Sequence, residues 1–170
     1  PTLDDNPDGQ PDFAGAFCGC ENLQGEIPPK LFDGIHGQPV TGMFLGVFQE
    51  CSGLTGTIPP GLFGELSGNY TEVLFAQTFG KCTGLEGKIP DDLFGNLGGQ
   101  PKKCMFTSTF YDDKGLNGKI PEKLFGDVNG CWICFKGGTP GLLKNTTITH
   151  NAPINEDVSN FQIGCPVFTT

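Results

Sequence analysis

The apolar positions of this chain recur every 31 residues, a spacing far longer than that of a helix or a strand. The pair Ile-Pro begins at residues 27, 58, 89 and 120. Four copies without insertion or deletion exclude chance and predict a stacked repeat. The same step relates Leu-x-Gly (Leu23, Leu54, Leu85, Leu116), Leu-Phe (31–32, 62–63, 93–94, 124–125), two phenylalanine series (Phe13, Phe44, Phe75, Phe106 and Phe17, Phe48, Phe79, Phe110) and Cys20, Cys51, Cys82 with Asp113 in the fourth copy.

Within one copy, the segment MFLGVFQEC at 43–51 predicts a short helix. Phe44, Phe48 and Cys51 are spaced as on one helix face. Gly53 follows as a helix-ending residue.

The segment LTGTIP at 54–59 predicts a short strand, because Leu54, Gly56 and Ile58 alternate with polar residues. Pro59 ends this strand and starts a second helical turn with Leu62, Phe63 and Leu66 inward. Residues 68–73 then form a variable surface loop.

No single copy can bury its apolar side alone, so the copies are expected to stack. The predicted fold is a repeat solenoid of mixed α/β type, with four 31-residue coils and a short parallel strand ladder over 13–136. Thr55, Glu86 and Asn117 form a polar row on it. The predicted core includes Cys20, Cys51, Cys82, Leu54, Ile58, Phe63, Phe75 and Phe79.

The repeat resembles leucine-rich repeats. LTGTIPPGLF at 54–63 is similar to the Leu-x-Gly-x-Ile-Pro segment of the plant type. FAQTFGKCTGLEGKIP at 75–90 resembles the Phe-x-x-Cys-x-x-Leu segment of bacterial surface, BspA-like repeats. The resemblance covers about residues 13–136. It implies an extracellular or surface recognition or adhesion protein without catalysis.

The N-terminal segment, residues 1–12, has the spacing of a calcium loop. Asp4, Asn6, Asp8 and Asp12 alternate with other residues, and Gly9 permits a sharp turn. The segment resembles loops of type 3 thrombospondin repeats and dockerins. Calcium is therefore the candidate cofactor, and a solvated acidic turn is the alternative.

Residues 137–170 break the period. A terminal repeat needs a cover for its exposed apolar face. A C-terminal cap is the first expectation for this segment, and an arm that packs on a neighbouring subunit is the second.

The cysteines favour structural disulfides. The CxxC at 131–134 lacks the strand–helix context of a redox site and the second ligand pair of a zinc site. The spacing suggests bridges Cys104–Cys134 and Cys131–Cys165, with Cys18 joined to a ladder cysteine.

Composition points to a secreted or cell-surface protein. Eight cysteines, the sequons at Asn69 and Asn145, and a start at Pro1 fit an oxidising compartment and a processed chain. A net charge of -9 with no basic stripe argues against nucleic acid. No apolar run is long enough to span a membrane.

The chain lacks a convergent nucleophile, base and acid, so no enzyme activity is expected. Two functions remain. The first is a self-assembling structural subunit of an extracellular appendage, sheath or matrix, because the first copy starts near residue 1 without an evident cap. The alternative is a recognition module that binds a protein or glycan through one face.

Overall fold

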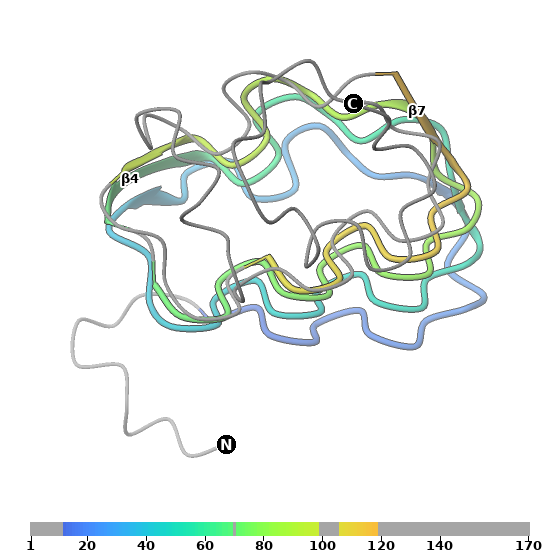
Figure 1. Ribbon diagram of the computed structural model, residues 1–170, viewed down its shortest axis with the longest axis horizontal. Coiled ribbons are helices and arrows are strands. Elements are labelled where there is room, and N and C mark those ends of the chain that lie inside the picture. The colour runs from blue at the N-terminus through green and yellow to red at the C-terminus, as the bar shows by residue number, and fades with distance from the viewer. Residues whose placement is uncertain (1–11, 70, 99–105, 119–170) are drawn as a thin grey trace, which may run out of the picture.

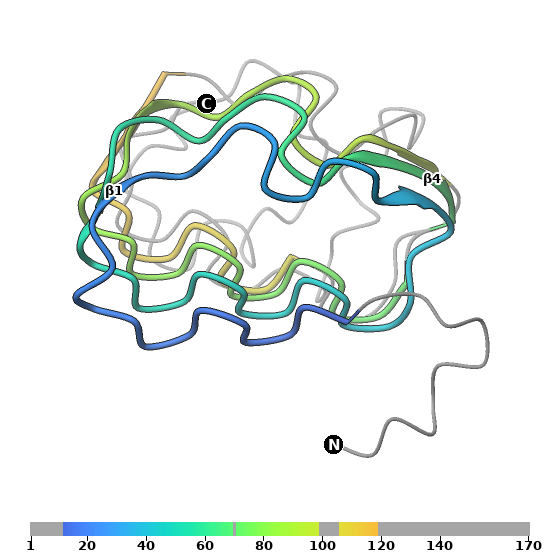
Figure 2. The same ribbon diagram turned by 180° about the vertical axis from the view of Figure 1, so that it is seen from behind.

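The computed structural model describes residues 12–69, 71–98 and 106–118. Within them the chain forms seven short strands and no helix. Figures 1 and 2 show the successive copies lying one on another as flattened turns of backbone. The strands are β1 (Gly25–Glu26), β2 (His36–Gly37), β3 (Leu54–Thr55), β4 (Glu65–Asn69), β5 (Glu86–Lys88), β6 (Asn96–Gly98) and β7 (Gly115–Asn117).

All strand pairs are parallel and join successive copies. β1 pairs with β3 and β5 with β7, while an isolated bridge between Gly56 and Leu85 links these two pairs. A further sheet, β2–β4–β6, forms on another side of the copies. The strand predicted at 54–59 is confirmed at Leu54–Thr55. The second sheet was not predicted.

The helix predicted at 43–51 is wrong, because residues 41–50 form successive turns. The N–H of Leu45 donates to the carbonyl of Gly42, three residues back, and the pattern continues from Val47 to Phe44. The φ angles of Gly42 (68°) and Gly46 (59°) lie in the left-handed region, which a right-handed helix cannot include. In these turns, side chains four residues apart lie on the same side. Phe44 and Phe48 therefore face the same way, as they would on a helix. We call the segments 14–19, 41–50, 72–81 and 106–112 the turn ribbon.

The second helical turn, predicted after Pro59, is also absent. Residues 60–63 form a turn and lead directly into β4. Leu62, Phe63 and Leu66 still point inward and are buried, as expected. β4 takes in the first residues of the predicted loop at 68–73.

Phenylalanine columns fill the space between the turn ribbon and the strands. Each column places equivalent rings of successive copies 5.5 to 6.2 Å apart in stacked geometry. Phe63 links the columns, because its ring lies 4.6 Å from Phe44 and 5.1 Å from Phe75. Offset rings at these distances add to the gain from burial. The columns are Phe13–Phe44–Phe75–Phe106, Phe17–Phe48–Phe79–Phe110 and Phe32–Phe63–Phe94.

In the second, third and fourth copies, the glycine before the Leu-x-Gly segment is required because the preceding copy lies so close. A Cβ atom at Gly53 would lie 2.7 Å from the carbonyl oxygen of Leu23. The equivalent Gly84 and Gly115 would clash with the carbonyls of Leu54 and Leu85. These glycines precede the Leu-x-Gly segment and permit close approach of the neighbouring copy.

Candidate functional site: the turn-ribbon face

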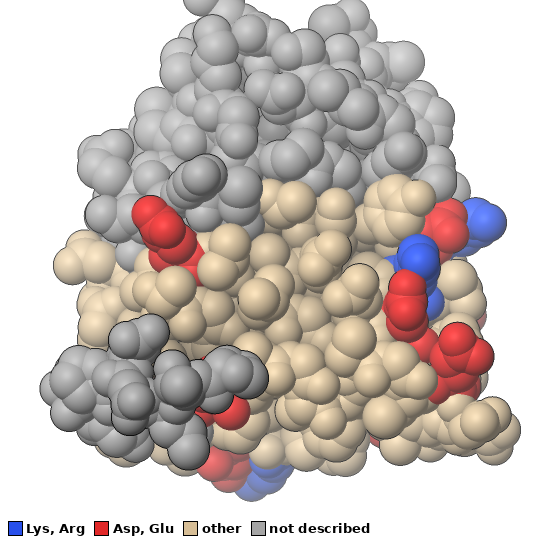
Figure 3. Space-filling model, turned by 90° about the horizontal axis from the view of Figure 1, so that it is seen from below, with Lys and Arg blue, Asp and Glu red and all other residues tan. Residues whose placement is uncertain are grey.

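The outer side of the turn ribbon is the candidate functional surface of the described residues. The ribbon segments of the four copies run side by side, as Figure 1 shows. Figure 3 looks onto this face and shows charged residues around its margins and other residues across its middle. The surface thus combines a mainly uncharged centre with a few charged groups.

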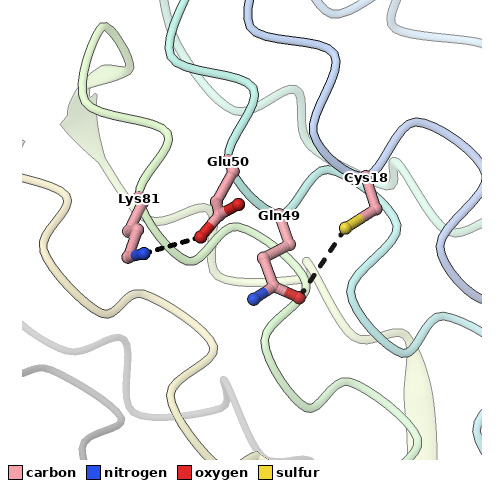
Figure 4. Close-up of polar contacts among 4 residues, drawn as sticks. All are labelled: Cys18, Gln49, Glu50 and Lys81. Carbon is pink, nitrogen blue, oxygen red and sulfur yellow. Dashed lines mark hydrogen bonds and ion pairs between the residues drawn. The ribbon is translucent and has the colours of Figure 1, made fainter.

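One row of equivalent positions carries charges of alternating sign. It contains Gly19, Glu50, Lys81 and Asp112, and all four have positive φ. Lys81 donates to Glu50 at 2.6 Å (Figure 4). This hydrogen bond and the negative charge of Glu50 raise the pKa of Lys81. Lys114 lies 3.6 Å from Asp112. Both pairs are solvent-exposed, so they orient side chains more than they stabilise the fold.

Two shallow hollows flank Lys81 on this face. One, of about 190 Å³, is lined by Gln49, Gln77, Gly80, Lys81, Ser108 and Tyr111. The other, of about 290 Å³, is lined by Glu21, Glu50, Ser52, Lys81, Thr83 and Asp112. Amides, hydroxyls (that of Tyr111 included) and charged groups can hydrogen-bond polar ligands such as saccharides. Sequence reasoning missed both hollows, because residues 31 positions apart meet only in the stack.

The ladder cysteines are donors inside the stack. Cys51 Sγ donates to the Phe17 carbonyl at 3.0 Å, and Cys82 Sγ to the Phe48 carbonyl at 2.9 Å. Burial raises the pKa of both thiols. A buried thiol of raised pKa is poorly reactive. These two residues therefore serve structure rather than chemistry.

Buried threonines make similar bonds in a neighbouring row. The hydroxyl of Thr78 lies 2.9 Å from the carbonyl of Phe44 and 2.8 Å from that of Phe75. Thr109 repeats the arrangement one copy later. Thr78 and Thr109 are 31 residues apart, so the sequence places them at equivalent positions. Only the fold shows that their hydroxyls lie inside.

Asp113 occupies the cysteine position of the fourth copy and is fully buried. Neither carboxyl oxygen has a hydrogen-bond partner within the described part of the chain. Burial is the main cause that raises the pKa of Asp113 well above its ordinary value, and the neighbouring Asp112 raises it further. The carboxyl group is therefore held toward its neutral form.

Most of the predicted core residues are buried as expected. Leu54, Ile58, Phe63, Phe75, Phe79, Cys51 and Cys82 are at most 3 % exposed. Cys20 is the exception. It is exposed, because no copy precedes the first one among the described residues to cover it.

Of the predicted calcium ligands, only Asp12 lies in the described residues. Its carboxylate accepts a hydrogen bond from the Ala14 N–H at 2.8 Å, which starts the ribbon turn. Asp4, Asn6 and Asp8 lie outside the described residues. Within 12–69, 71–98 and 106–118, no group of three or more His, Cys, Asp or Glu is placed to hold a metal ion.

The described cysteines are all thiols. Cys18, Cys20, Cys51 and Cys82 are unpaired, and Cys18 Sγ lies 3.9 Å from Gln49 Oε1 (Figure 4). A bridge from Cys18 to a ladder cysteine is thus not formed. The other predicted disulfide residues, Cys104, Cys131, Cys134 and Cys165, lie outside the described residues.

Asn69 of the first sequon ends β4 and is exposed. The Gln38 side chain makes two hydrogen bonds to the Asn69 backbone. It accepts from the Asn69 N–H at 2.7 Å and donates to the Asn69 carbonyl at 2.6 Å. Thr71 donates to the Val40 carbonyl at 3.0 Å. Asn145, of the second sequon, lies outside the described residues.

The polar row predicted on the solenoid lies on the strands. Thr55, Glu86 and Asn117 are exposed at equivalent positions of β3, β5 and β7. None of these three residues lines either of the two hollows. The row is therefore a second surface, separate from the turn-ribbon face.

Comparison with protein-family models, curated proteins and solved structures finds no match to this chain. Among the described residues, no helix has the length and apolar character needed to cross a membrane.

Proposed function

We propose that this protein is a non-enzymatic structural repeat protein of the leucine-rich-repeat-like solenoid class, acting as a self-assembling subunit of an extracellular appendage, sheath or matrix. One observation carries the proposal. Contacts between equivalent positions of successive copies recur through the described core, so the stack is both the fold and a pattern that a further copy can extend.

The degree of burial along the stack supports this proposal. Phe44, Phe75 and Phe106 are fully buried, whereas Phe13, at the start of the same column, is only partly buried. Interior copies gain their burial from neighbours on both sides. The first copy has a described neighbour on one side only.

The test is static light scattering and negative-stain electron microscopy of the full chain, each with calcium and with a chelator. We expect filaments or large oligomers whose size increases with protein concentration. Dissolution on chelation would assign calcium, through Asp4, Asn6, Asp8 and Asp12, to the joint between subunits. A particle that stays monomeric at every concentration would refute the assembly role.

Recognition of a glycan or an extracellular protein is the second candidate function. The two hollows around Lys81 favour it, because the lining of the first offers amide, hydroxyl and aromatic groups and that of the second offers hydroxyls and charged groups. A glycan-array screen comparing the full chain with the Gln49→Ala and Gln77→Ala variants tests this candidate. Binding that both variants weaken would support it, and binding that neither variant changes would place the ligand elsewhere.

A further inference from the structure

Hydrogen bonds between copies run in one direction along the turn ribbon. The N–H groups of Phe13, Gly15, Phe17 and Gly19 donate to the carbonyls of the second copy. The second copy donates to the third in the same way, for example from Phe44 to Leu74. Along the turn ribbon, each copy therefore donates N–H groups to the following copy and accepts from the preceding one.

The first copy has acceptors without donors. In the second copy, the carbonyls of Met43, Leu45, Val47 and Gln49 accept bonds from the first. Their equivalents, 31 residues earlier, accept no hydrogen bond from any described residue, and all four residues are exposed. These four residues are Asp12, Ala14, Ala16 and Cys18.

The ribbon N–H groups of this copy are already engaged. Those at 13, 15, 17 and 19 donate to the second copy, and those of Ala16, Cys18 and Cys20 donate within the first. Ala14 donates to the Asp12 carboxylate. The end of the ribbon therefore presents a row of acceptors, two residues apart, with no ribbon donor among them.

Apolar surface accompanies the carbonyl row. Leu23 is 38 % exposed, whereas its equivalents Leu54 and Leu85 are 3 % and 0 % exposed. Phe13 and Phe17 are partly buried against the core, while the later rings of their columns are fully covered. The surface thus lacks the covering that every interior copy receives from its predecessor.

We infer that the N-terminal end of the first copy is a docking surface for a second copy of this chain, which donates a row of backbone N–H groups to these four carbonyls. The inference rests on the proposed function and names the surface and its polarity. The partner must provide donors at two-residue spacing and rings that continue the phenylalanine columns. The interior junctions of this chain show that its own repeat meets both requirements.

The contact is heterologous. Two such ends facing each other would bring acceptors against acceptors, so a symmetric dimer through this surface leaves the carbonyls unpaired. Unpaired polar groups at a closed interface cost free energy. A heterologous contact that does not close on itself generates an open chain of subunits.

The first experiment is sedimentation velocity of the full chain over a dilution series. Ala16→Glu and Leu23→Glu place a charge on the docking surface, and Thr55→Glu places the same charge on the exposed face of β3 as the matched control. We expect both end variants to need at least a tenfold higher concentration for assembly. The control should assemble like the wild type, and the thermal unfolding midpoint of each variant verifies that it is folded.

The second experiment is alkylation with iodoacetamide, read at each cysteine by peptide mass spectrometry. Cys20 is exposed at the docking end, whereas its equivalents Cys51 and Cys82 are buried in covered copies, so assembly should slow the modification of Cys20 at least tenfold. Cys51 and Cys82 are buried and should stay unmodified throughout, which verifies that the chain is folded.

The outcomes separate the two proposals. Assembly that leaves Cys20 reactive, or that tolerates both end variants, refutes this docking surface but keeps the structural function. A wild-type chain that stays monomeric at every concentration refutes both.

Discussion

Asp113 places a carboxyl group at a position where the preceding copies have a thiol. The two preceding residues of its row, Cys51 and Cys82, each donate a thiol hydrogen to a phenylalanine carbonyl. Asp113 is equally buried but has no partner within the described residues. A carboxyl group there is tolerated best in its neutral form.

The raised pKa of Asp113 predicts a stability that falls as pH rises. Below the ordinary Asp pKa of about 3.9, the group is neutral in both states and costs least. As pH rises, the unfolded chain ionises first, so the folded state loses stability until its own raised pKa is passed. Asp113→Asn removes the ionisable group and with it this loss of stability. Thermal unfolding from pH 4 to 8 should show a midpoint difference, variant minus wild type, that grows with pH.

The matched control for this experiment is Asp112→Asn. Asp112 is adjacent to Asp113, but its side chain is 26 % exposed and pairs with Lys114. Because Asp112 contributes only part of the raised pKa of Asp113, its substitution should give a smaller increase of the midpoint difference with pH than Asp113→Asn gives. A constant difference for Asp113→Asn would show that the folded chain does not resist ionisation of this group.

Among the elements, the turn ribbon depends most on unusual backbone conformation. Every fourth residue has positive φ, supplied by glycine up to Gly46 and by other residues from Glu50 onward. Gly46 (φ 59°) and Gln77 (φ 57°) are equivalent positions and show this change. A residue with a side chain pays roughly 1–2 kcal/mol for this conformation.

Gln77→Gly should therefore stabilise the fold by about 0.5–1 kcal/mol, because the relief of backbone strain exceeds the added entropy of the unfolded chain. Gln77→Ala removes the same exposed side chain but keeps the strain, so it should change the free energy of unfolding little. Gly46→Ala should destabilise the fold by about 1 kcal/mol. Urea unfolding at equilibrium measures all three. Equal effects of Gly and Ala at position 77 would contradict a conformational cause.

The sequence was sufficient for the register of the ribbon but not for its conformation. The 31-residue step identified the phenylalanine columns, the buried Leu54 and the strand that begins there. It did not identify the turns, because an α-helix and this ribbon both return a side chain to one face after four residues. Nothing in the local sequence of Gln77 or Glu50 predicts a positive φ, because contacts with the neighbouring copy determine this conformation.

The same reason explains which parts of the candidate site were missed. The two hollows and the Glu50–Lys81 pair join residues from different copies, and their positions depend on how the ribbon segments lie side by side. The β2–β4–β6 sheet includes segments such as GN at 68–69, which carry little strand preference on their own. Hydrogen bonds between copies, rather than local propensity, determine these strands.

For the whole molecule, stability should depend on the place of a copy in the stack. In a quasi-one-dimensional repeat protein, each copy is stabilised by its own contacts and by its interfaces with its neighbours. Phe17 and Phe48 belong to the same column but differ in coverage, and Phe48 also contacts the Phe32 ring at 6.2 Å. Phe48 stacks on Phe17 at 5.5 Å and on Phe79 at 5.6 Å, whereas the one stacking partner of Phe17 among the described residues is Phe48.

Phe48→Ala should therefore destabilise the fold by roughly 3–5 kcal/mol, the usual cost of an interior Phe→Ala cavity. Phe17→Ala removes the same atoms from a partly buried site and should cost less than half as much, because solvent already reaches it. Urea unfolding of both variants at a protein concentration below assembly measures the difference. If the surface of the first copy is a docking end, raising the concentration until subunits stack should bring the cost of Phe17→Ala closer to that of Phe48→Ala. Equal costs in the dilute monomer would mean that the first copy is already covered, and the assembly argument would then lose its physical basis.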